Sequence, residues 1–457
     1  MYVLLYSCDM TEDGDAQTRD GFSGKRGFIL ASIGSAVGMG NIWRFPAMVS
    51  LWGGLTFIIP YLIFVVLISA TGVIGEFALG RAAKAGPCGA FGMCTERRFG
   101  NRKVGERIGL IPVIGSLALA IGYTCVVAWI IKYTVMAFDG DLFAMGQDMD
   151  VIAGMFNDTA SAWGANMWVV VAAVATLLIM SLGVSKGIEK ANNILMPLLF
   201  TLLIGLAIYV ATLPGASAGY SYILTIDMDL LANPLVWIFA FGQAFFSLSV
   251  AGNGSVIYGS YFKRNESIPS AAFYVAFFDT VSALLAAMVI IPAMAAGGAE
   301  LNEGGPGLMF VYIVNVFNGM DGGYIVGIVF FVSVLFAGMA SIVNLYEAPV
   351  SFLQERFGAG RVKATLTMVV IGGAVALCIQ SIVSPWMDGV SIYICPLGAL
   401  LAAVMLFWVA GKDFAEREAS EGAKKPIGKW FVPLGKYAYC ALSLIALVAG
   451  ALLGGIG

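Results

Sequence analysis

The chain has 457 residues, of which 60% are hydrophobic and only 12% are charged, whereas globular proteins carry about 25% charged residues. Together with a mean hydropathy of +0.89, these values exclude a soluble enzyme, a disordered tail and a nucleic-acid-binding protein. They indicate a polytopic protein of the lipid bilayer. The sequence contains no His, which excludes imidazole as a base, a relay or a metal ligand. Its 7 Cys lack metal-ligand spacing and are interpreted as packing residues.

In chain order, residues 1–25 are expected to form a cytoplasmic N-terminal tail and residues 26–457 a single transmembrane domain. A helix needs about 20 apolar residues to cross the bilayer core. Eleven stretches of this kind are predicted: 26–51, 55–80, 109–138, 166–184, 191–213, 232–262, 269–297, 323–354, 363–384, 387–411 and 432–456.

The basic residues orient these spans. All of the 25 Lys and Arg except Arg44 and Lys132 fall in the tail, loops and span ends that share a side with the N-terminus. Loops on the other side are acidic. Because positive charge favours the cytoplasmic face, we expect a cytoplasmic N-terminus and an extracytoplasmic C-terminus in the plasma membrane of a bacterium.

Two spans carry small and polar residues at mid-membrane depth. The first contains the segment 34–41, GSAVGMGN, and the sixth contains the segment 247–255, SLSVAGNGS. Each glycine weakens a helix by about 1 kcal/mol relative to Ala, and irregular backbone at this depth must face protein or a watery cavity. Close packing of unbroken helices through small residues is the alternative for either segment.

Matching interruptions five spans apart favour a transporter with two five-helix repeats and a binding site at the midplane. The repeats are expected at about 26–213 and 232–411, followed by one extra helix at about 432–456. The fold class is therefore all-α, with eleven transmembrane helices and spans 1 and 6 unwound at the midplane.

Ionisable residues inside the spans are costly and indicate function. They are Arg44, Glu76, Asp279, Glu347 and Asp388. The Asp279 carboxylate requires a cation, which a metal ion, an Arg or a proton could supply. Glu76 either braces a broken helix or carries a proton. Arg44 and Asp388 have opposite charges near the outer ends of their spans, so that they either close as a gate or extend to the membrane surface.

The segment 34–46, GSAVGMGNIWRFP, resembles the first-helix signature of the bacterial neurotransmitter:sodium symporters. Gly80-Arg81 after Glu76, the segment 243–249, and Ala337-Gly338 with Ser341 extend the resemblance, which runs from about Arg19 to Asp388. It implies the LeuT-like fold, an inverted five-helix repeat, and a transporter instead of an enzyme.

The resemblance also implies one or two Na⁺ sites. Sodium site one maps to Ala36, Asn41, Ser247 and Asp279. Sodium site two maps to Gly34, Val37, Ala337 and Ser341, with Ala340 where the family has a second hydroxyl. Because Asp279 supplies a fixed negative charge and Ala283 replaces the family's chloride-binding serine, no chloride requirement is expected.

The implied substrate is an α-amino acid, because no acid occupies the Ser35–Ala36 stretch where monoamine carriers have one. Amides of the first broken helix and the Tyr123 hydroxyl would hold its carboxylate. Gly252 leaves the far wall open, which favours a hydrophobic or aromatic side chain. The implied pocket residues are Ser35, Ala36, Gly40, Leu119, Tyr123, Phe246, Ser247, Ser249, Gly252, Ser341 and Leu345.

Gates map in the same way: Arg44 with Asp388 and Tyr123 with Phe246 outside, and Arg19 with Glu355 inside. The family's inner tryptophan is Phe22 here, and Gly187 with Pro197 resembles the motif at which span 5 unwinds.

The sequence thus predicts a sodium-coupled symporter that imports a small neutral amino acid by alternating access. A non-transporting amino acid sensor of the same fold remains the alternative. The sequence leaves the oligomeric state open.

Overall fold

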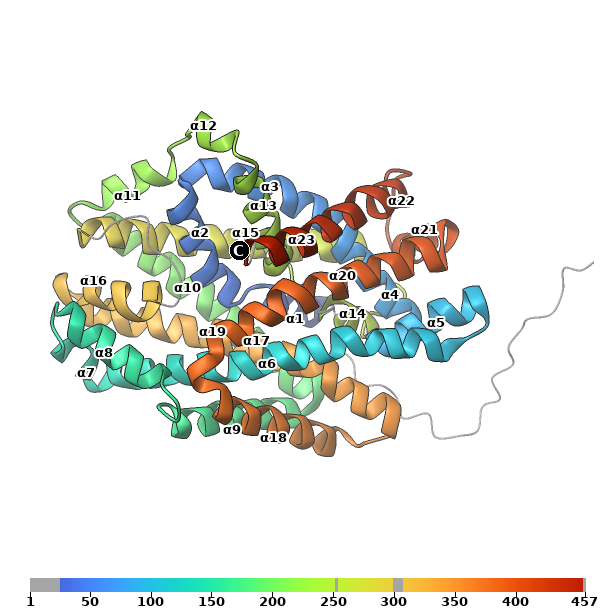
Figure 1. The fold of residues 1–457 in the computed structure, drawn as a ribbon, viewed down its shortest axis with the longest axis horizontal. Coiled ribbons are helices and arrows are strands. Elements are labelled where there is room, and N and C mark those ends of the chain that lie inside the picture. The colour runs from blue at the N-terminus through green and yellow to red at the C-terminus, as the bar shows by residue number, and fades with distance from the viewer. Residues whose placement is uncertain (1–24, 251–253, 299–306, 455–457) are drawn as a thin grey trace, which may run out of the picture.

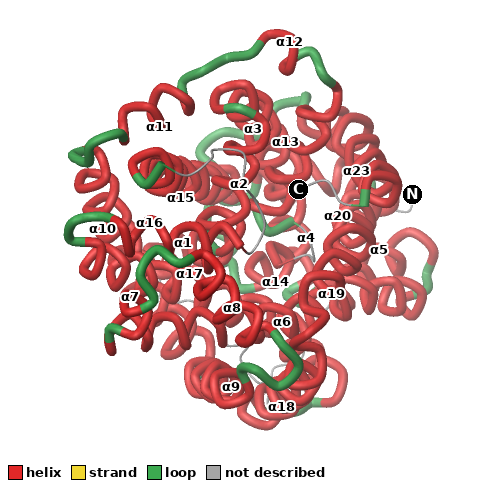
Figure 2. The backbone as a smooth tube through the Cα atoms, turned by 60° about the vertical axis from the view of Figure 1, so that its left-hand side comes forward, coloured by secondary structure: helices red, strands yellow, loops and turns green. Residues whose placement is uncertain are grey.

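The computed structural model describes residues 25–250, 254–298 and 307–454, and within these ranges every regular element is a helix (Figure 2). Long helices run along the longest axis of the molecule (Figure 1). Helices α7, α8, α11 and α16 lie at one end of this axis, and α5, α21 and α22 lie at the other. Seven helices of the described chain are long and apolar enough to cross a membrane: Gly54–Ala83, Arg102–Asp139, Val184–Ala211, Ile268–Ala296, Gly323–Phe357, Arg361–Ala410 and Phe431–Leu453.

Three of these long helices are continuous: α6 (Arg102–Asp139), α15 (Ile268–Ala296) and α17 (Gly323–Phe357). The other four contain local changes of winding and consist of α3 (Gly54–Ile68), η2 (Ser69–Val73), α4 (Ile74–Ala83), η3 (Val184–Glu189), α10 (Lys190–Ala211), α18 (Arg361–Ile379), η5 (Gln380–Ile382), α19 (Val383–Gly389), η6 (Val390–Ile394), α20 (Cys395–Val404), η7 (Met405–Ala410), α22 (Phe431–Pro433), η8 (Leu434–Tyr439) and α23 (Cys440–Leu453). Shorter helices connect them: α5 (Pro87–Phe99), α7 (Asp141–Ala144), α8 (Met149–Ala160), α11 (Ala216–Ile223), α12 (Met228–Leu231), η4 (Leu308–Tyr312), α16 (Ile313–Gly319) and α21 (Lys412–Ser420).

The other expected spans are interrupted or shorter. Expected span 4 is α9 (Asn166–Ser181). Expected spans 9 and 10 fall in the run Arg361–Ala410, which departs from helical geometry at Ile379 (φ −101°), just before η5, and at Ile382 (φ −122°), the last residue of η5. The count of eleven depends on dividing this run there and stays a prediction, as do the repeat boundaries.

Span 1 is broken. Helix α1 (Lys25–Ala36) ends before Val37 and Gly38, and the chain becomes helical again in η1 (Gly40–Arg44) and α2 (Phe45–Trp52). The Gly38 N–H, which the break removes from the helical ladder, donates to Asn41 Oδ1 at 3.0 Å. A side chain thus replaces the lost backbone acceptor, as burial requires.

Span 6 is broken next to the break in span 1. Helix α13 (Pro234–Ser247) and helix α14 (Gly254–Ser260) flank the break, where Ser249 adopts φ +55°. The Ser249 hydroxyl donates to the Ser35 carbonyl at 2.6 Å, and Gln243 Nε2 donates to the Gly40 carbonyl at 2.9 Å. Side chains of span 6 therefore satisfy two backbone carbonyls beside the break in span 1. The predicted unwinding of both spans is confirmed.

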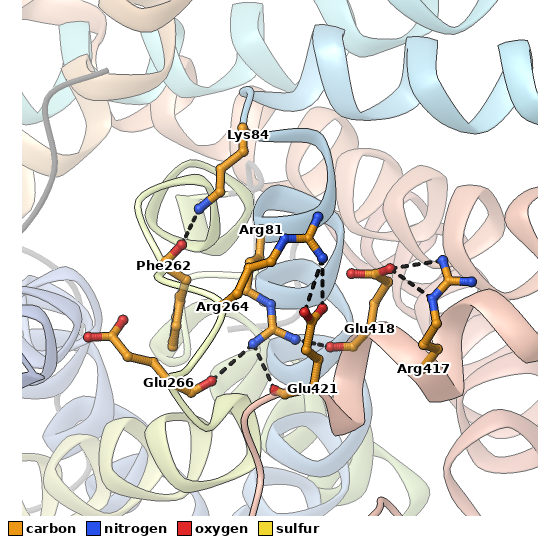
Figure 3. A network of polar contacts seen from close by, with 8 residues as sticks. All are labelled: Arg81, Lys84, Phe262, Arg264, Glu266, Arg417, Glu418 and Glu421. Carbon is orange, nitrogen blue, oxygen red and sulfur yellow. Dashed lines mark hydrogen bonds and ion pairs between the residues drawn. The ribbon is translucent and has the colours of Figure 1, made fainter. Parts of the chain in front are cut away.

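Helix α4 contacts α14, the α14–α15 loop and α21. A Cβ on Gly80 would lie 1.9 Å from the Val256 carbonyl, so only glycine permits this backbone contact. The buried Arg81 guanidinium donates to the carbonyls of Glu266 (3.0 Å), Glu421 (2.9 Å) and Glu418 (Figure 3). Arg81 thus fastens α21 and the α14–α15 loop to α4.

Candidate functional site

Three polar side chains from three elements meet where the breaks in spans 1 and 6 face α15. Asn41 Nδ2 donates to Asp279 Oδ1 at 2.7 Å, and the Ser247 hydroxyl lies 2.9 Å from each Asp279 carboxylate oxygen. All three side chains are almost completely buried. A buried carboxylate with a hydroxyl oxygen beside it is suited to a hard cation such as Na⁺, and the Asn41 amide, which here turns its nitrogen to the carboxylate, carries a further oxygen. The structure thereby brings together the three side chains expected at sodium site one.

Sequence reasoning missed Tyr61, the fourth polar group at this position. Its hydroxyl lies 3.3 Å from Asp279 Oδ2 and 3.5 Å from Ser247 Oγ. Tyr61 lies in α3 and is packed against Phe45 with ring centroids 4.7 Å apart. In the sequence it stands within an apolar stretch, where nothing distinguishes it from a packing aromatic residue.

A cavity of about 50 Å³ opens beside this cluster. Every expected pocket residue that the structure describes lines it: Ser35, Ala36, Gly40, Leu119, Tyr123, Phe246, Ser247, Ser249, Ser341 and Leu345. Gly252 lies outside the described residues. No Asp or Glu is among the described residues that line the cavity. Its walls are contributed by the two breaks, by α6 and by α17.

Asn344 of α17 is a lining residue that the sequence did not indicate. Its Nδ2 donates to the Gly34 carbonyl at 2.9 Å, whereas its buried Oδ1 has no hydrogen-bond partner among the described residues. Buried polar atoms normally have a partner. Asn344 therefore offers an acceptor next to the cavity in addition to holding the end of α1.

The residues expected at sodium site two lie along the contact between α1 and α17. A Cβ on Gly38 would be 2.1 Å from Ser341 Oγ, so that the Ser341 hydroxyl lies directly against the first break. Val37 and Ala337 are fully buried nearby. Ala340 is also buried and contributes a methyl group where the resemblance expects a hydroxyl. The position offers fewer side-chain oxygens than site one.

Tyr123 and Phe246 separate the inner cavity from a larger one of about 360 Å³, because both residues line both cavities. Arg44 and Asp388 line the larger cavity. The Arg44 guanidinium lies 4.6 Å from the centre of the Phe246 ring. Among the described residues no ion pair within 4.0 Å joins Arg44 to Asp388. The structure therefore places the four outer-gate residues around one vestibule, with Arg44 stacked on the expected lid.

Comparison with known proteins identifies the family. The model of the sodium:neurotransmitter symporter family matches residues 19–148 and 149–418. The chain belongs to this family. The resemblance of the first-helix signature is thus confirmed, and the family consists of sodium-coupled multi-pass membrane transporters and not of enzymes.

Members of this family resemble the chain in sequence and in structure. A sodium-dependent transporter of Methanocaldococcus jannaschii, itself uncharacterized, is 29% identical over 94% of this chain and 89% of its own length. The uncharacterized sodium-dependent transporter YhdH of Bacillus subtilis is 31% identical over 71% of this chain and 70% of its own. The crystal structure of MhsT in complex with L-phenylalanine matches with a TM-score of 0.83 and 32% identity, covering 94% of this chain and 100% of that chain. This likeness confirms the LeuT-like fold.

A buried ion pair that the sequence did not indicate joins α17 and α18. Both guanidinium nitrogens of Arg361 contact the Glu347 carboxylate at 2.7 Å, and the Tyr261 hydroxyl donates to it at 2.6 Å. Glu355, the expected partner of Arg19, accepts from the Gly86 N–H at 2.8 Å. Arg19 and Phe22 lie outside the described residues. Arg361 is the first residue of α18. In the sequence nothing distinguishes it from the other basic residues of the loops.

Glu76 is buried in α4 at this family's second span. The interpretations as a brace and as a proton carrier both stay predictions. Gly187 lies in η3, a stretch of wider winding, and Pro197 lies inside α10. The predicted weak start of span 5 therefore coincides with irregular helix.

Proposed function

We propose that this family member is a sodium-coupled symporter that imports a neutral amino acid with a hydrophobic or aromatic side chain across the plasma membrane of a bacterium. The single observation that carries the proposal is the meeting of Asn41, Ser247 and Asp279 at the two helix breaks, beside a cavity lined by both breaks. An ion bound at this position would contact the substrate directly. Binding of one would then favour binding of the other.

The chemistry of the cavity supports an amino acid as the substrate. Broken-helix amides near Gly40, together with the Tyr123 hydroxyl, suit a carboxylate. Phe246, Leu119 and Leu345 supply apolar walls. The absence of Asp and Glu from the described lining disfavours an amine without its own carboxylate. The related MhsT was crystallised in complex with L-phenylalanine.

Alternating access follows from differential affinity. Sodium binding favours the outward-open state. The substrate then completes the first site, Phe246 and Tyr123 close over the cavity, and the inner gate is released. Each sodium ion that moves down a potential of 100 mV contributes about 2.3 kcal/mol. The basic loops favour a cytoplasmic N-terminus and an extracytoplasmic C-terminus. We propose full occupancy of site one and weaker occupancy of site two, because Ala340 lacks an oxygen.

Uptake by reconstituted vesicles tests the proposal. Vesicles with an inward sodium gradient should accumulate labelled phenylalanine, and a panel of the twenty amino acids as competitors should rank apolar side chains first. Replacement of sodium by choline should abolish accumulation, and Asp279→Ala should do the same in sodium. Accumulation that persists in choline would overturn sodium coupling.

A sensor that binds but does not transport is the rival function, and the methyl group of Ala340 at sodium site two favours it. Counterflow separates the two functions. Vesicles preloaded with unlabelled substrate should take up labelled substrate if the chain is a carrier. Sodium-dependent binding without counterflow would assign the sensor.

A further inference from the structure

A second cavity lies at the end of the molecule that carries α5, α21 and α22 (Figure 1), far along the chain from the sodium cluster. It is an open cavity with a volume of about 530 Å³, lined by α5, η7, α21, α22 and η8. Four basic side chains line it: Arg97, Arg98, Lys412 and Lys436. No Asp or Glu is among its described lining residues.

The charge of this cavity is largely uncompensated. Lys412 lies 3.9 Å from Glu416, a loose and exposed contact. Within the described part of the chain, Arg97, Arg98 and Lys436 form no ion pair. A neighbouring cavity of about 510 Å³ shows the opposite arrangement, since Glu106 there pairs with Arg102 at 2.9 Å. A cluster of unpaired cations around a hollow raises the local concentration of anions.

Exposed aromatic side chains indicate that this cavity lies at the boundary of the membrane. Lys436 Nζ lies 4.2 Å from the centre of the Trp408 ring. Trp408 is 50% exposed and Tyr437 is 62% exposed. Exposed Trp and Tyr beside Lys and Arg are typical of the boundary between acyl chains and head groups.

An apolar face leads from the cavity into the bilayer. The span Phe431–Leu453 has only 22% of its most apolar stretch buried within the protein. Its exposed residues Tyr437, Leu444, Val448 and Leu452 recur at helical spacing, so that they form one stripe beginning at the cavity. An acyl chain can lie along this stripe while its head group fills the basic hollow.

We propose that this cavity binds the head group of an anionic phospholipid. Its phosphate would contact Arg98 and Lys436, and its acyl chains would follow the exposed face of α23. Basic pockets between helices at a membrane boundary have the chemistry for this ligand. A free inorganic anion shares the phosphate chemistry but would make no use of the apolar stripe.

Native mass spectrometry of the full chain in detergent tests the site with phosphatidylglycerol and phosphatidylcholine. The purified protein should bind the first and not the second. The double variant Arg98→Gln/Lys436→Gln should bind phosphatidylglycerol about thirty-fold more weakly, because each basic residue near the membrane surface contributes about 1 kcal/mol. Lys103→Gln/Arg107→Gln is the matched control, which removes two charges from the neighbouring cavity and should leave binding unchanged.

Three outcomes would overturn the proposal: unchanged binding in the double variant, an equal loss in the control, or displacement of the lipid by millimolar inorganic phosphate. If the double variant fails to fold, Lys436→Gln and Lys436→Arg replace it. Only the first of these should weaken binding, and equal effects of the two would count against the site.

Discussion

Asn41 Nδ2 donates to Asp279 Oδ1 at 2.7 Å and to the Asp279 carbonyl at 2.9 Å, so that one amide spans a side chain and a backbone group of α15. Asn41 Oδ1 accepts the Gly38 N–H at the same time. A sodium ion takes oxygen ligands, so Asn41 can bind one beside Asp279 only if its amide turns its oxygen toward the ion. Ion binding and the geometry of the first break are therefore linked through a single side chain.

Asp279→Asn should weaken sodium activation of uptake on the order of a hundredfold or more, because a unit charge about 4 Å from a cation is worth roughly 4 kcal/mol at an effective dielectric constant of about 20. The amide can still accept from Ser247, so the fold should persist. The sodium concentration at half-maximal uptake measures the effect. An unchanged value would show that Asp279 does not face the ion.

Chloride should be dispensable in the unmodified protein, because Asp279 supplies the negative charge and Ala283 of the same helix has no hydroxyl. Uptake should therefore be the same when gluconate replaces chloride on both sides of the vesicle membrane. A fall in uptake that is restored by chloride would contradict this expectation.

The sequence predicts the breaks and the side chains at sodium site one, because glycines clustered with Ser and Asn inside an apolar span weaken the helix at that depth and supply polar groups to the unwound backbone. It does not predict Tyr61 or Asn344, whose roles arise from contacts between spans that no local pattern records. The same limit applies to Arg44. Opposite charge suggests Asp388 as its partner, but the Phe246 ring lies 4.6 Å away and provides a desolvated surface for the guanidinium.

The Glu347–Arg361 pair should stabilise the packing of α17 against α18. Removing one partner of a buried pair costs about 3–5 kcal/mol, and the value should be at the lower end because Arg361 is 15% exposed. Arg361→Met should therefore lower the Tm more than the double variant Glu347→Gln/Arg361→Met, which leaves no unpaired carboxylate. Thermal denaturation in detergent measures both, and an equal Tm for the two variants would show that the unpaired Glu347 carboxylate does not destabilise the fold.

Phe246→Leu should weaken substrate binding about two- to thirty-fold, since a cation–π contact is worth about 0.5–2 kcal/mol. The variant keeps an apolar side chain but gives Arg44 no ring to lie on. Phe246→Tyr keeps the ring and should bind substrate as the unmodified protein does. Equilibrium binding of labelled substrate measures both, and equal weakening by Leu and Tyr would assign the effect to packing instead of to Arg44.

Gly34→Ala tests the contact between α1 and α10 that positions the first break. The added Cβ would lie 2.1 Å from Asn192 Oδ1, and overpacking of this kind costs about 1–3 kcal/mol. Gly154→Ala in α8 is the matched control, because its Cβ would meet nothing within 4 Å. The Tm should fall for the first variant and not for the second. Asn192→Ala removes the clashing oxygen, so the double variant Gly34→Ala/Asn192→Ala should recover the Tm of Asn192→Ala alone, and additive losses would show that the two residues are not in contact.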